Sequence, residues 1–155
     1  MEHFITPPMA ESLIRESQVE AQKAIDEGNP PFGCVITDVY GRIVMRAHNT
    51  QNTDHDPTAH AEINALSRLG RELGNRSLKE YIMVANAESC SMCASAAVKA
   101  YVEVFFYGAP AEGRMNPQIH MSDIADATSM PLQITGGILA EECAAQIALG
   151  RQTEK

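Results

Sequence analysis

Apolar residues recur at helical spacing in the first part of the chain. Between Met9 and Glu27 they fall three or four positions apart, and the run Gly28-Asn29-Pro30-Pro31 ends the pattern. Two stretches rich in β-branched residues follow, FGCVITDV and GRIVMRAHN, separated by a short break at Tyr40-Gly41. The pattern predicts one helix and then an antiparallel hairpin.

The middle of the chain alternates helical and extended patterns. Pro57 suits the first turn of a helix, where its missing N–H costs nothing, and this helix is expected to run to about Gly70. After it, YIMVANA is typical of a buried strand, SCSMCASAAVKA of a helix of small residues, and YVEVFFYGA of another strand. Strands that alternate with helices need crossover connections, so we expect part of the sheet to be parallel.

The last third of the chain is less regular. Residues 110–130 are rich in Pro, Gly, Met and Asp, and they are expected to form a loop with a short helix around residues 122–127. PLQIT adds a strand, and GGILAEECAAQIALG predicts a closing amphipathic helix. Its inward residues are expected to be Ile138, Leu139, Cys143, Ile147 and Leu149. Without a repeat or a linker, the pattern predicts a single domain over residues 1–155.

Composition indicates a globular protein, with 45% hydrophobic and 21% charged residues. No apolar run approaches the roughly 18 residues that span a bilayer, so we expect no membrane association. The start, MEHFITPPMAES, lacks the apolar core of a secretory signal. The four cysteines are too few and too unevenly spaced for a disulfide framework. We therefore expect a cytoplasmic protein whose cysteines are thiols.

The net charge of -8 bears on the partner. Binding to nucleic acid depends largely on Lys and Arg displacing counterions, and the twelve basic residues are scattered along the chain. The charge therefore argues against a nucleic-acid partner.

Three residues could hold a metal ion. Cys90 and Cys93 form a Cys-x-x-Cys step at the start of a predicted helix, and His60 lies near the start of another. Two thiolates and one imidazole suit Zn²⁺, and helix N-termini lower thiol pKa values, which favours the ligand form. Catalytic zinc commonly has three protein ligands and keeps its fourth position for water.

Glu62 lies two residues from His60 and could reach such a water. Zinc lowers the pKa of bound water toward about 7, and a nearby carboxylate can take its proton and deliver it to a leaving amine. The four residues therefore fit hydrolytic removal of an amino group. The Cys-x-x-Cys step alone also fits core packing or a redox pair. A structural zinc module would need a fourth ligand, for which His55 is the nearby candidate.

The combination of HAE at residues 60–62 with SCSMC at residues 89–93 resembles the cytidine deaminase-like family of zinc deaminases. The resemblance implies a three-layer α/β/α sandwich with a central five-stranded mixed sheet, and a homodimer or a larger homo-oligomer. It also implies one Zn²⁺ per chain, bound by His60, Cys90 and Cys93, with Glu62 as the catalytic proton shuttle.

The same resemblance assigns the substrate contacts. It implies that Asn49 hydrogen-bonds the ring or ribose, and that Phe32 and Ala61 line the pocket, with the Ala61 amide near the substrate carbonyl. One departure concerns Ser89, which stands where the family usually has proline. Serine can act as an N-cap through its hydroxyl, so we expect the site to survive.

The substrate class is narrowed by other segments. DPTAHAE and PFG look most similar to the guanine deaminase and fungal-type cytosine deaminase branch, which implies a free base as substrate. After YGA the chain reads PAEGRMNPQIHMSD, without the aromatic-acidic stretch of guanine deaminases. We therefore expect a deaminase of guanine, cytosine or a related 2-amino-4-oxo ring such as isocytosine. The alternatives are a tRNA adenosine or nucleoside deaminase of the same family, and a structural zinc module without enzymatic activity.

Overall fold

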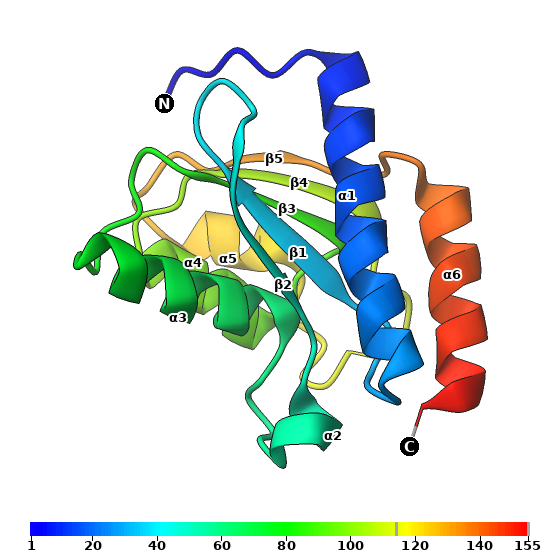
Figure 1. Cartoon of the computed structure of the whole chain (residues 1–155). Coiled ribbons are helices and arrows are strands. Elements are labelled where there is room, and N and C mark those ends of the chain that lie inside the picture. The colour runs from blue at the N-terminus through cyan, green and yellow to red at the C-terminus, as the bar shows by residue number, and fades with distance from the viewer. Residues whose placement is uncertain (114, 155) are drawn as a thin grey trace.

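The computed structural model describes residues 1–113 and 115–154. A five-stranded sheet in the order β2-β1-β3-β4-β5 forms its centre (Figure 1). Its strands are β1 (Gly33–Thr37), β2 (Ile43–His48), β3 (Ile82–Ala87), β4 (Val104–Ala109) and β5 (Gln133–Thr135). β1 pairs antiparallel with β2 and β3, whereas β3, β4 and β5 pair in parallel. The expected hairpin and mixed sheet are confirmed.

Helices cover both faces of this sheet. They are α1 (Pro7–Asp26), α2 (Gln51–Asp54), α3 (Ala61–Leu73), α4 (Ser91–Lys99), α5 (Met121–Ala127) and α6 (Ala140–Thr153). In Figure 1, α1 and α6 lie side by side on one face, and α3, α4 and α5 cover the other. The expected three-layer α/β/α sandwich is therefore confirmed. Of the described helices, none has the length and apolar character needed to cross a membrane.

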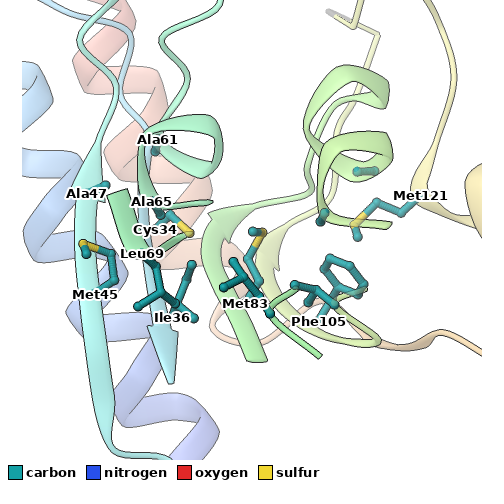
Figure 2. Close-up of a cluster of buried hydrophobic side chains, with 14 residues drawn as sticks. Cys34, Ile36, Met45, Ala47, Ala61, Ala65, Leu69, Met83, Phe105 and Met121 are labelled. Atoms are coloured by element: carbon teal, nitrogen blue, oxygen red, sulfur yellow. The ribbon is translucent and has the colours of Figure 1, made fainter. Parts of the chain in front are cut away.

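The two cores follow the alternation of the strands. Ile36, Met83 and Phe105 project from three strands toward α3, α4 and α5, as Figure 2 shows. Their neighbours Val35 and Val84 point to the opposite face, where α1 and α6 pack. Successive strand residues face opposite sides of a sheet. Because helices cover both faces here, a continuous apolar run places its side chains alternately in the two cores.

The strand directions bring four segments to one edge of the sheet. Gly33, at the start of β1, pairs with His48, at the end of β2. The ends of β3 and β4 meet where Ala87 pairs with Ala109. Since β1 runs antiparallel to both β2 and β3, its start lies beside their ends. Phe32, Asn49 and the loops after β3 and β4 are consequently gathered at this edge.

The start of α3 differs from the prediction. The helix begins at Ala61 rather than at Pro57. The Asp56 carboxylate accepts hydrogen bonds from the N–H and the hydroxyl of Thr58, at 2.8 and 2.7 Å, and so closes a local turn. Such Asx turns compete with helix formation. His60 becomes the N-cap of α3, with extended backbone angles, so it still lies at the helix entrance.

The inward face of α6 differs from the prediction in one residue. Cys143 is buried and Ile147 packs against the same core, as expected, but Leu149 is 65% exposed. Gly150 takes the inward position instead, because residues 143, 147 and 150 share one helix face. A Cβ at Gly150 would lie 2.5 Å from Cβ of Pro31, so glycine lets α6 approach the loop that carries Phe32.

Candidate active site

The three predicted metal ligands converge. His60 Nδ1 lies 3.5 Å from Cys90 Sγ and 3.3 Å from Cys93 Sγ, and the two sulfur atoms are 3.6 Å apart. A tetrahedral zinc ion with ordinary bond lengths would place its ligand atoms about 3.6 Å (N to S) and about 3.8 Å (S to S) apart. The observed distances fall within a few tenths of an ångström of these values. The donor set therefore fits zinc.

The fold explains this convergence. His60 is the N-cap of α3 and Cys90 is the N-cap of α4, and neither cap residue makes a side-chain hydrogen bond to its helix. α3 and α4 pack against each other on one face of the sheet. Cys93 lies in the first turn of α4 and is fully buried. The ligand side chains are thus free to face one another across two adjacent helix starts.

The electrostatics of the two thiols are opposed. A hydrogen bond with Cys93 lowers the pKa of Cys90 to about 4, assisted by His60 and opposed by burial. The same hydrogen bond and burial raise the pKa of Cys93 above its ordinary range. Its hydrogen bond with Cys90 raises the pKa of His60. Contact among the three groups therefore favours the thiolate form at Cys90, and binding of a cation would release the proton of Cys93.

Glu62 lies beside this cluster and is 7% exposed. Burial raises the pKa of its carboxyl group, while the nearby His60 charge and a hydrogen bond from Ser89 lower it. A buried carboxyl group with a raised pKa is suited to accept and return a proton, as a general acid-base catalyst must.

Ser89 differs from its predicted role. The N-cap of α4 is Cys90, and the hydroxyl of Ser89 does not cap the helix. The Ser89 side chain, 4% exposed, hydrogen-bonds the Glu62 carboxylate instead. The residue that replaces the family's usual proline thus contacts the candidate proton shuttle.

A cleft of about 760 Å³ opens next to His60, Glu62 and Cys90. Two of the predicted substrate contacts, Phe32 and Asn49, are among its lining residues. Ala61 is fully buried in the core between the sheet and α3, and its side chain does not line the cleft. The role predicted for its backbone amide stays a prediction.

Several lining residues were not predicted from the sequence, among them Gln51, Glu88 and Arg151. Gln51, in the unpredicted helix α2, hydrogen-bonds Asn49. Arg151, near the end of α6, stacks over the Phe32 ring, with its Cζ atom 5.1 Å from the ring centroid. Glu88 holds the loop after β4 through its side chain. Gln51 and Arg151 lie outside the motifs and reach the cleft only through the tertiary fold, whereas Glu88 directly precedes SCSMC.

The fourth ligand required by a structural zinc module is missing from the cluster. Among the residues that the structure describes, the metal-ligating group comprises His60, Cys90 and Cys93. His55, the predicted candidate, is exposed and lies outside this group. The arrangement is that of a zinc site with an open position, which catalytic sites require.

Residues 8–109 match the family model of the cytidine and deoxycytidylate deaminase zinc-binding region. The chain belongs to this family. It is a zinc-binding hydrolytic deaminase, and the match includes all three candidate ligand residues and Glu62.

Relatives of the deaminase differ in the substrates that their names give. The tRNA-specific adenosine deaminase of Bacillus subtilis is 30% identical over 140 residues, covering 89% of this chain and 86% of the relative. A probable cytosine deaminase of Schizosaccharomyces pombe is 30% identical over 141 residues, covering 84% and 85%. The guanine deaminase structure from Nitrosomonas europaea aligns with a TM-score of 0.83 at 19% identity, over 97% of this chain and 87% of that one. At this identity, the structural likeness shows the fold.

Proposed function

We propose that this deaminase acts on a free amino-nucleobase, which is guanine, cytosine or a related 2-amino-4-oxo ring such as isocytosine. The charge of the cleft carries the proposal. Its described lining residues include four carboxylates, those of Glu62, Glu88, Glu112 and Glu154. The lining cation among them, Arg151, is paired with Glu154 at 3.1 Å. Among its described lining residues the cleft thus offers the phosphates of a polynucleotide no unpaired Lys or Arg, and its carboxylates suit a neutral base with amino groups.

The residues divide the reaction between them. His60, Cys90 and Cys93 would hold the zinc ion, which supplies Lewis-acid activation of water. The Glu62 carboxylate would accept the proton of the attacking water and pass it to the leaving amino group. The ring carbon gains an oxygen atom as its C–N bond breaks, and ammonia leaves. Phe32 and Asn49 would contact the ring, by stacking and by hydrogen bonding.

A tRNA adenosine deaminase is the second candidate. The identity with the enzyme from Bacillus subtilis favours it, since the likeness extends over most of both chains. The net charge of -8 and the acidic cleft oppose it, because an anticodon stem-loop brings a phosphate backbone to the site.

Ammonia release from a substrate panel tests the proposal. The panel comprises guanine, cytosine, isocytosine, cytidine, adenine and a tRNA anticodon stem-loop, with zinc-loaded protein. We expect turnover of at least one free base, and no turnover by a Glu62→Gln preparation, which controls for contaminating deaminases. Turnover of the stem-loop alone would refute the free-base proposal. The homo-oligomeric state and the cytoplasmic location stay predictions.

A further inference from the structure

The side chain of Glu88 is buried at the end of β3, with 5% of its surface exposed. Its Oε1 accepts a hydrogen bond from the backbone N–H of Ala111 at 3.1 Å. Its Oε2 accepts one from the backbone N–H of Met121 and one from His120 Nδ1, both at 3.0 Å. The charge of a buried carboxylate is thus compensated by two backbone donors and one imidazole.

These partners lie at the two ends of one segment. Ala111 follows β4 by two residues, and Met121 is the first residue of α5. The backbone N–H of Glu88 also donates to Ala109 O at 2.8 Å, so the exit of β4 is held twice. A single residue therefore fastens both ends of the connection between β4 and α5.

The fastened connection forms a wall of the cleft. Its described lining residues are Ala109, Pro110, Ala111, Glu112, Met115, Asn116 and Pro117. The described residues 110–113 and 115–120 belong to no helix or strand. Because the sheet does not fix this backbone, its position depends on the hydrogen bonds at its ends.

We propose that Glu88 is a positioning residue, which holds residues 109–113 and 115–121 as a preformed wall of the cleft and thereby determines which ring the cleft accepts. The inference rests on the proposed function for the nature of the substrate. Glu88 follows β3 and precedes the zinc ligand Cys90 by two residues. The residue that holds the wall is thus itself held close to the metal site. A preformed wall lowers the ordering cost of substrate binding, so its effect falls on KM and on selectivity.

A carboxylate is specifically required for this role. It offers two acceptor oxygens and no donor, which matches three donors arriving from two directions. A glutamine of nearly the same size keeps one acceptor oxygen and turns an NH₂ group toward the other donors. Glu88→Gln should therefore release one end of the segment while leaving the side-chain volume unchanged.

Glu20 offers a matched control. Its side chain is 3% exposed, pairs with Lys23 at 2.7 Å and has an oxygen 3.9 Å from His48 Nδ1, and it is not among the described lining residues of the cleft. Glu20→Gln makes the same chemical change at another buried carboxylate. The Glu20→Gln variant therefore shows how a general loss of stability affects exchange and kinetics when the hydrogen bonds to the wall are intact.

The first measurement is hydrogen exchange of zinc-loaded protein, which requires no substrate. In Glu88→Gln we expect the amide of Ala111 or Met121 to exchange at least about tenfold faster, with β3 and β4 unchanged. Glu20→Gln should leave both amides as in the wild type. Unchanged exchange at both amides in Glu88→Gln would overturn the proposal. If this variant is not recovered folded, His120→Ala takes its place, with faster exchange expected at Met121 alone; unchanged exchange there would overturn the proposal equally.

The second measurement is kinetic, on the base that the wild type prefers. We expect Glu88→Gln to raise KM about tenfold and to shift the ratio of kcat/KM between purine and pyrimidine bases, with kcat within about threefold and zinc content unchanged. A fall in kcat with unchanged KM and selectivity would overturn the proposed effect on substrate choice. Absence of free-base turnover in the wild type would refute the proposed function. The hydrogen-exchange measurement would still test the positioning role of Glu88, because it requires no substrate.

Discussion

The side-chain amide of Asn49 is held in place by Gln51. Asn49 Oδ1 accepts the backbone N–H of Gln51 at 2.9 Å, and Asn49 Nδ2 donates to Gln51 Oε1 at 2.8 Å. Gln51 is fixed in turn, because its Nε2 donates to Pro57 O at 2.9 Å. An amide nitrogen carries two hydrogens, so one hydrogen of Asn49 Nδ2 stays available for an acceptor on a substrate ring. The short helix α2 thus orients a residue that lines the cleft.

Gln51→Ala should therefore weaken substrate binding without impairing the chemical step. The backbone N–H of residue 51 still holds Asn49 Oδ1, but the amide nitrogen loses its partner. We expect KM to rise about threefold to tenfold and kcat to stay within about twofold, as measured by steady-state ammonia release. Asn49→Ala should raise KM further, since it removes the donor itself. An effect of Gln51→Ala on kcat alone would contradict this orientation role.

Glu62→Gln should separate metal binding from catalysis. The variant keeps the size of the side chain and leaves His60, Cys90 and Cys93 intact, so zinc content should stay near one ion per chain. The amide cannot accept and return a proton, and turnover should fall by at least about a thousandfold. Metal analysis and ammonia release on the same preparation test both parts. Retained turnover would remove Glu62 from the role of proton shuttle.

Removal of zinc should abolish turnover but leave the fold in place. Neither of the two described core clusters includes a candidate ligand, His60, Cys90 or Cys93. A metal that binds only the folded chain still contributes to stability by mass action. We therefore expect chelation to lower Tm by several degrees with little change in the far-ultraviolet circular dichroism. Unfolding on chelation would instead favour a structural zinc module.

The hydrogen bond between Ser89 and Glu62 predicts a change in pH dependence. Because this bond lowers the pKa of Glu62, Ser89→Ala should raise that pKa further. As the pH falls, Glu62 then becomes protonated at a higher pH and can no longer accept a proton. The acid limb of the kcat profile should therefore move upward in pH. At neutral pH, kcat should fall by up to about tenfold, since a hydrogen bond to a charged group is lost. A pH–rate profile of both proteins measures the shift, and an unshifted acid limb would contradict it.

The convergence of His60, Cys90 and Cys93 could be predicted from the chain because residue type and spacing identify a candidate metal site together. His60 and Cys90 each begin a helix, a position that local sequence patterns mark. The start of α3 was misjudged, because the turn closed by Asp56 prevails over the preference of Pro57 for a helix start. Gln51 and Arg151 lie outside the HAE and SCSMC motifs, and Glu88 precedes SCSMC directly, but only the folded chain shows what their side chains contact. Their roles depend on tertiary packing, which periodicity does not encode.

Gly150 and Leu149 allow a direct test of how α6 contributes to the cleft. A Cβ at Gly150 would lie 2.5 Å from Pro31 Cβ and 2.8 Å from Ile25 Cγ1, so Gly150→Ala must push α6 away from the loop that carries Phe32. Overpacking of this kind costs about 1–3 kcal/mol of unfolding free energy. Leu149, at 65% exposure, should tolerate Leu149→Ala within about 0.5 kcal/mol.

Thermal or urea denaturation of the two variants measures this difference. Kinetics then extend the test, because Arg151 follows Gly150 directly and stacks on Phe32. Gly150→Ala should displace that stack from the cleft and raise KM, whereas Leu149→Ala should leave KM unchanged. Equal stability losses in the two variants would mean that α6 does not pack through Gly150. A stability loss without a change in KM would mean that the stack of Arg151 on Phe32 makes no contribution to substrate binding.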